Sequence, residues 1–148
     1  MLPTLQIQDK ILVEKLITKI NLKDNLFNLK DNIVVFKPPE TLIKAGYDSD
    51  IALIKRVIGI PGDKIEVKDG SLYLNDEIQN KFITDKNINY SIGPVIVPEN
   101  SLWVMGDNRN NSLDSHVWGP LPYKKIIGRA FLRYWPLNHF GPIYFPAA

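Results

Sequence analysis

The chain has 148 residues, of which 45% are hydrophobic, and a net charge of +2. This composition is sufficient for one domain with a buried core, and the charge is too small and too scattered for a nucleic-acid-binding protein. The chain contains no cysteine, which excludes a disulfide framework and a thiolate metal site. The two histidines, His116 and His139, lack the spacing of a zinc site. We therefore expect neither a metal ion nor a cofactor.

The hydrophobic pattern predicts a mostly antiparallel β fold. Pro61-Gly62 can occupy the centre of a type II turn, and Asp69-Gly70 is the favoured two-residue turn of a β-hairpin. One helical turn is expected at 41–45. The expected strands cover residues 11–17, 33–36, 51–60, 64–68, 71–75, 81–83, 95–97, 101–105 and 126–135.

These elements suggest a main domain with one insertion. We expect the main domain to cover residues 1–136 and to contain a smaller β subdomain over 63–100, which includes the hairpin. The segment 137–148 is rich in proline and, together with Pro136 before it, is expected to be a loose tail. No apolar run approaches the roughly 20 residues needed to cross a bilayer.

One charged pair, Lys55-Arg56, interrupts the apolar strand expected at 51–60. Lysine is almost never fully buried without a partner. Burial would lower the pKa of the Lys55 amine and could make it a general base near neutral pH. Alternatively, the side chain extends along its methylene groups and keeps its ammonium in solvent. The strand by itself favours the solvent-exposed alternative, whereas the rest of the chain favours the buried base.

A dense polar loop, residues 106–115, follows the strand expected at 101–105. Its spacing does not fit a calcium loop: counting from Asp107, Ser112 falls where glycine is required and Trp118 where a bidentate acid is required. The loop could instead satisfy its own backbone, with asparagine and aspartate side chains bonding to nearby peptide groups.

Two side chains of this loop could also reach a neighbouring strand. Ser112 offers a hydroxyl and Asp114 a carboxylate. If the amine of Lys55 is the neighbour, Ser112 can orient it, while Asp114 can hold Arg56 or Arg109 and so fix the loop.

Three separated motifs resemble those of one family, the type I signal peptidases. Met1-Leu2-Pro3-Thr4-Leu5 resembles the segment after the nucleophile, S-M-x-P-T-L. Residues 55–63 resemble the general-base strand K-R-V-x-G-x-P-G-D, and residues 106–119 resemble the G-D-N-R-x-N-S-x-D-S box with the Trp-Gly pair that follows it. The match covers residues 1 to about 136. The residues at positions 110 and 116 and the long connection at 38–50 are most similar to the cyanobacterial and thylakoid-processing branch.

The resemblance implies a partly open antiparallel β-barrel and a serine endopeptidase with a Ser/Lys dyad. In this mechanism a serine hydroxyl attacks a peptide carbonyl while a neutral lysine takes its proton. Carried over to this chain, Lys55 is the general base and Ser112 orients it. The nucleophile would be the residue immediately before Met1, so the chain is expected to be truncated and inactive as it stands. The implied supporting residues are Arg56, Asp107, Asn108, Arg109 and Asp114.

The resemblance also implies the substrate, an extended peptide bound as an added strand, with cleavage after Ala-x-Ala. The partners would be signal peptides of translocated proteins and a membrane surface, with the catalytic domain on the extracytoplasmic side (periplasm or thylakoid lumen). Apart from the resemblance, Arg129, Arg133, Tyr134 and Trp135 could lie near lipid headgroups, although an ordinary strand with exposed arginines would explain them as well. Met1, Leu5, Leu53 and Ile54 would line the first pocket, Ile11, Val35 and Ile54 the second, with Pro3 also at the substrate site. Ordinary core packing would explain each of these apolar side chains as well.

One other function remains open, and a second is disfavoured. A non-catalytic β module could bind extended peptides without cleaving them. A self-cleaving repressor domain uses a similar dyad, but the chain shows no helical DNA-binding module, and its Gly-Asp-Asn-Arg box resembles that of the signal peptidases.

Overall fold

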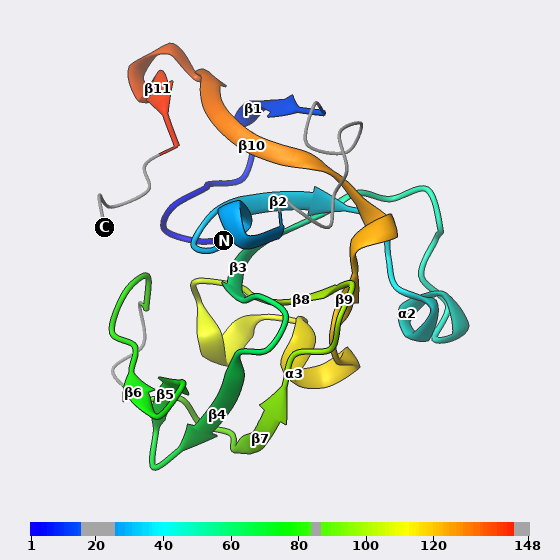
Figure 1. The fold of residues 1–148 in the computed structure, drawn as a ribbon. Coiled ribbons are helices and arrows are strands. Elements are labelled where there is room, and N and C mark those ends of the chain that lie inside the picture. Colours follow the sequence, from blue (N-terminus) through cyan, green and yellow to red (C-terminus); the bar gives the residue numbers. More distant parts are fainter. Residues whose placement is uncertain (16–25, 84–86, 144–148) are drawn as a thin grey trace.

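The computed structural model describes residues 1–15, 26–83 and 87–143, and within them two antiparallel sheets dominate (Figure 1). The larger sheet is open, with the strand order β1-β10-β2-β3-β8-β9, and β11 pairs with β10. This arrangement confirms the predicted mostly antiparallel β fold. The strands are β1 (Lys10–Glu14), β2 (Ile33–Phe36), β3 (Leu53–Gly59), β8 (Ser101–Met105), β9 (Leu121–Pro122), β10 (Ile126–Trp135) and β11 (Gly141–Pro142).

The smaller sheet lies within the segment expected to form a subdomain and has the order β6-β5-β4-β7. The predicted turn of its hairpin is confirmed: Asp69 and Gly70 both have positive φ, 50° and 75°, as a type I′ turn requires. The strand predicted at 81–83 is wrong, because Phe82 has a φ of 56° and turns its ring onto the Arg56 guanidinium, 3.7 Å away. The strands are β4 (Lys64–Lys68), β5 (Ser71–Leu74), β6 (Glu77–Ile78) and β7 (Ile92–Ile96).

The helices of the described residues are short. The helical turn expected at 41–45 is confirmed as α2 (Glu40–Lys44), whereas α3 (Ser115–Trp118) was not expected and is capped by the Asp114 carboxylate. None of the helices in the described parts is long and apolar enough to cross a membrane. The 3-10 turns are η2 (Leu26–Leu29), η3 (Arg109–Asn111), η4 (Tyr123–Lys125) and η5 (Leu137–His139).

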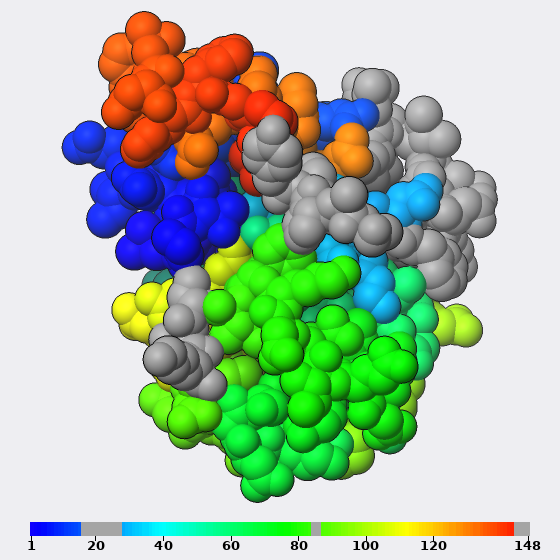
Figure 2. Space-filling view, turned by 90° about the vertical axis from the view of Figure 1, so that its left-hand side faces the viewer, coloured from blue at the N-terminus to red at the C-terminus, as the bar shows by residue number. Residues whose placement is uncertain are grey.

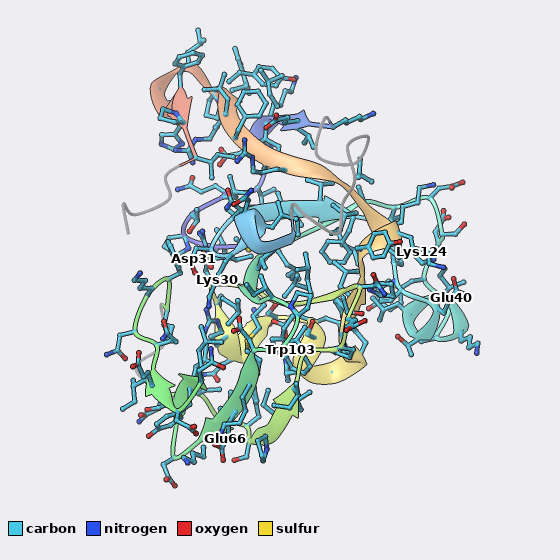
Figure 3. All side chains as sticks on the ribbon, in the orientation of Figure 1. Lys30, Asp31, Glu40, Glu66, Trp103 and Lys124 are labelled. Atoms are coloured by element: carbon cyan, nitrogen blue, oxygen red, sulfur yellow. The ribbon has the colours of Figure 1, made fainter. Side chains whose placement is uncertain are left out.

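Strand β8 joins the two sheets into one structure. Successive side chains of a strand point to opposite faces, and on β8 Leu102 and Val104 pack into one hydrophobic core while Trp103 and Met105 pack into another. The first core lies against β2 and β3 of the larger sheet, and the second lies against the smaller sheet. Trp103 accordingly lies between the sheets (Figure 3). The polar loop that follows β8 is therefore held at the junction.

The expectation of a loose tail from Pro136 is wrong for residues 136–143. β11 pairs with β10, so that Pro142 lies opposite Leu132. Ile143 is buried and packs with Leu5, Ile33 and Ala130. Figure 2 shows the N-terminal residues beside this C-terminal segment. Because Ile143 can bury its apolar side chain there, the proline-rich composition does not leave this part of the tail free. Residues 144–148 lie outside the described residues.

Candidate active site

Lys55 lies on β3, a central strand of the larger sheet, between β2 and β8. It pairs with Val34 of β2, and its side chain is partly buried. Burial lowers the pKa of the Lys55 amine, and the charges of Asp114 and Asp107 act in the opposite direction without cancelling that effect. A partly desolvated lysine with a lowered pKa is a candidate general base.

Ser112 comes close to Lys55 because position 106 is glycine. A Cβ placed on Gly106 would collide with the Ser112 hydroxyl, and it would lie 2.8 Å from the Ser112 Cβ and 3.6 Å from the Lys55 Nζ. The hydroxyl and the amine therefore occupy the same small space in front of Gly106. The Ser112 Oγ is buried and makes no hydrogen bond to any described residue.

The amino group of Met1 lies at the same site. Its pKa is lowered, first by burial and then by the charge of Lys55, while Asp107 acts in the opposite direction. The first residue and the polar loop, which are more than 100 positions apart in sequence, thus both come within electrostatic reach of the Lys55 amine.

Arg56 and Asp107 form a buried ion pair beneath this site. The Arg56 Nε and Nη2 donate to the two carboxylate oxygens of Asp107 at 2.8 and 2.9 Å, and Nη1 donates to the carbonyl of Asp31 at 2.8 Å. The Thr4 hydroxyl donates to Asp107 at 2.6 Å. Asp107 therefore ties the N-terminal segment to β3 and to the polar loop.

The expectation that Asp114 holds Arg56 or Arg109 is wrong. Asp114 is fully buried and accepts hydrogen bonds from the Gly106 N–H at 2.9 Å and from the backbone N–H of His116 at 3.2 Å. Its carboxylate also lies 2.6 Å from the imidazole Nδ1 of His116. Arg109 donates through Nε to the Gly106 carbonyl, and its burial lowers its pKa. Asp114 closes the loop onto its own backbone instead of pairing with an arginine.

Asn108 and the residues after it complete the loop. Asn108 precedes η3, and its carbonyl accepts the Asn111 N–H. The side chain of Asn110 accepts from the Asn89 N–H at 2.7 Å and donates to the Asn87 carbonyl at 2.7 Å. Sequence reasoning did not assign contacts to Asn110, although an asparagine in a loop commonly bonds to a nearby backbone.

Other contacts of the site were also not anticipated from the sequence. The ring of Tyr90 stacks on His116, with centroids 3.9 Å apart and planes 9° from parallel. Nothing in the local pattern around Tyr90 or Thr4 indicates these partners. In the described part of the chain, no group of three or more His, Asp or Glu side chains is arranged to hold a metal ion.

The residues expected to line the substrate pockets are distributed over two clusters. Leu5 packs with Ile33, Ala130 and Ile143, and Met1, Ile11 and Ile54 pack against that cluster. The structure separates Leu53 from them, because adjacent residues of a strand face opposite sides and Leu53 packs against the core of β2 and β8. Val35 is half-buried opposite Ile54, and Pro3 is exposed.

Comparisons with known proteins identify the family of this chain. The family model described as signal peptidase, peptidase S26, matches residues 1–135. The chain is 44% identical over 143 residues to a probable thylakoidal processing peptidase 2 of Arabidopsis thaliana, which covers 97% of this chain and 38% of that protein. It is 40% identical over 139 residues to a probable signal peptidase I-2 of Synechocystis sp., covering 94% of this chain and 61% of that protein. The chain thus spans less than two thirds of the length of these two relatives.

Two further comparisons concern another relative and a solved structure. A signal peptidase I of Leptolyngbya laminosa is 41% identical over 143 residues, covering 97% of this chain and 68% of that protein. A crystal structure of a signal peptidase I from Enterococcus faecalis has the same fold, with a TM-score of 0.53 and 24% identity, over 68% of this chain and 93% of that chain. The chain belongs to the signal peptidase family, peptidase S26.

Proposed function

We propose that this chain is the catalytic domain of a type I signal peptidase, a membrane-associated serine endopeptidase. It would remove N-terminal signal peptides from translocated proteins on the extracytoplasmic side, with the 63–100 segment as its smaller β subdomain. The observation that carries the proposal is the position of the Lys55 amine. It is partly buried and its pKa is lowered, it faces the same side of Gly106 as the Ser112 hydroxyl, and its charge acts on the amino group of Met1.

The proposed mechanism uses a serine placed immediately before Met1. Neutral Lys55 takes the proton of the serine hydroxyl as its oxygen attacks the carbonyl carbon of the substrate peptide bond. Lys55 then gives this proton to the leaving amine, and water hydrolyses the ester that remains on the serine. Ser112 would orient the amine, because its hydroxyl and the amine both approach Gly106 and the hydroxyl has no other hydrogen-bonding partner among the described residues. We expect the 148-residue chain without that serine to be inactive.

The proposed substrate is an extended peptide with small residues at the cleavage site, of the type Ala-x-Ala. Met1, Leu5 and Ile54 would contact the residue before the cut, and Ile11, Val35 and Ile54 the residue two positions further upstream. Large side chains would be excluded because Leu5 belongs to a buried cluster and Ile11 and Ile54 already pack against that cluster.

The membrane contact is proposed for one end of the larger sheet. Exposed apolar and aromatic side chains gather on the last part of β10, on η5 and on the residue that follows η5. Aromatic rings at such a surface suit the boundary between lipid headgroups and acyl chains. The exposed side chains are Phe131, Tyr134, Trp135, Leu137 and Phe140.

The test is to add an upstream segment that ends in serine directly before Met1 and to assay cleavage of a peptide with one Ala-x-Ala site. The serine-extended chain should cut after the second alanine, whereas the 148-residue chain should not. Lys55→Met in the extended chain should lower kcat/KM by about 10²- to 10⁴-fold, the usual contribution of a general base. Lys68→Met, the same change at an exposed lysine of β4, is the matched control and should leave the rate unchanged.

Two outcomes would contradict the proposal. Full activity of the Lys55→Met variant would remove Lys55 from the mechanism. Binding of the peptide without cleavage by the serine-extended chain would instead favour the non-catalytic peptide-binding module.

A further inference from the structure

His116 contacts the carboxylate of Asp114 on one side of α3. The imidazole Nδ1 lies 2.6 Å from the Asp114 Oδ1. Because a carboxylate can only accept, Nδ1 must carry the hydrogen in this contact. The Asp114 side chain is fully buried, and 16% of the His116 side chain is exposed. The imidazole therefore remains open to proton exchange with solvent while it contacts a buried negative charge.

Asp114 in turn contacts the centre of the proposed active site. Its Oδ2 accepts from the Gly106 N–H at 2.9 Å, and Gly106 is the residue against which Ser112 and the Lys55 amine are placed. The negative charge of Asp114 also favours the charged form of Lys55. One carboxylate thus joins the imidazole, the backbone of the polar loop and the lysine.

Among the described residues, two groups contact the imidazole of His116 directly. Tyr90, from the segment between β6 and β7, covers one face of the imidazole, and Asp114 lies at its Nδ1. β8, which packs against α3, carries no titratable side chain. Beyond Asp114 lie Lys55 and Arg109, whose charges both interact with that carboxylate. Asp114 is accordingly the direct electrostatic link between the imidazole and Lys55.

We infer that His116 is a positioning residue for Lys55 and that His116 acts through Asp114. A neutral imidazole leaves the full negative charge of Asp114 to stabilise the Lys55 ammonium. A protonated imidazole offsets that charge, so that Lys55 loses protons more readily. The two side chains therefore bind protons anticooperatively, and the fraction of neutral Lys55 falls less steeply with decreasing pH than for an isolated amine. The effect on catalysis rests on the proposed function. The coupling between His116 and Lys55 does not depend on that function.

The test compares two variants. His116→Arg carries a permanent positive charge, whereas His116→Gln keeps a hydrogen-bond donor but can carry no charge. The full 148-residue chain is labelled with ¹³Cε-lysine, and the Lys55 signal, assigned with Lys55→Met, is followed by NMR against pH. We expect the Lys55 midpoint to be lower in His116→Arg than in His116→Gln. The matched control is His139→Gln, the same change in η5, which packs on β10. The Lys55 midpoint of this variant should equal that of the wild type.

The wild-type chain provides a second measurement, which does not depend on any structural effect of a substitution. The Lys55 signal should show a second, smaller step at the pH where the His116 Cε1–H signal titrates. Equal Lys55 midpoints in the two variants, or the absence of that step in the wild type, would overturn the inference.

Activity of the serine-extended chain gives the catalytic readout. Below the Lys55 midpoint, kcat/KM of His116→Arg should exceed that of His116→Gln by about fivefold or more, the lower end of common coupling between sites. The two variants should converge at alkaline pH. If the serine-extended wild type cleaves nothing, the proposed function fails, and the NMR midpoints still decide whether His116 acts on Lys55.

Discussion

Gly106 can be tested as the residue that allows Ser112 to approach Lys55. Gly106→Ala would place a methyl group 2.8 Å from the Ser112 Cβ and against its hydroxyl. Overpacking of this kind costs about 1–3 kcal/mol. Gly106 does not have a positive φ, so alanine also gains about 0.4–1 kcal/mol by restricting the unfolded chain. The difference is a net loss of about 0–2.6 kcal/mol in the free energy of unfolding.

The assay is urea unfolding followed by tryptophan fluorescence, because Trp103 and Trp118 are buried and their emission changes on exposure. Gly106→Ala is measured in three backgrounds: Ser112, Ser112→Ala, which removes the hydroxyl, and Ser112→Gly, which also removes Cβ. The loss of unfolding free energy caused by Gly106→Ala should be largest with Ser112, smaller with Ser112→Ala and smallest with Ser112→Gly. The losses in the Ser112 and Ser112→Gly backgrounds should differ by a coupling energy of about 0.5–3 kcal/mol. An equal penalty in all three backgrounds would refute the reasoning.

Two further predictions concern charge burial. Lys55→Met should stabilise the chain below the folded-state pKa of Lys55, because burial lowers that pKa and the folded chain then holds a poorly solvated ammonium. As the pH rises from that value towards the ordinary lysine pKa, the unfolded chain binds more protons, so the wild type gains stability and the advantage of methionine disappears. Urea unfolding at several pH values measures this difference, and a difference independent of pH would contradict the prediction. Arg56→Met should cost about 3–5 kcal/mol, because it leaves the buried Asp107 carboxylate without its bidentate partner. Thr4→Val removes one hydrogen bond to the same carboxylate and should cost only about 1.5–3 kcal/mol; the reverse order would show that Arg56 is not the main partner of Asp107.

The local sequence determined the β-rich fold and much of its strand pattern. The strand predicted at 126–135 is β10 as observed, and the turn at Asp69-Gly70 closes the expected hairpin. These features depend on side-chain alternation and on residues that tolerate positive φ, and both are properties of short segments. The sequence also indicated the residue pair Lys55 and Ser112, through motifs that resemble a known family.

Only the tertiary structure decided which charged groups contact one another. Asp107, not Asp114, holds Arg56, and His116 lies on the carboxylate of Asp114. The burial of Ile143 was likewise decided by a cluster whose other members come from distant parts of the chain. The physical reason is the same in each case. A carboxylate or an apolar side chain is satisfied by whichever partner the packed strands bring within a few ångströms, and the local pattern carries no record of that partner.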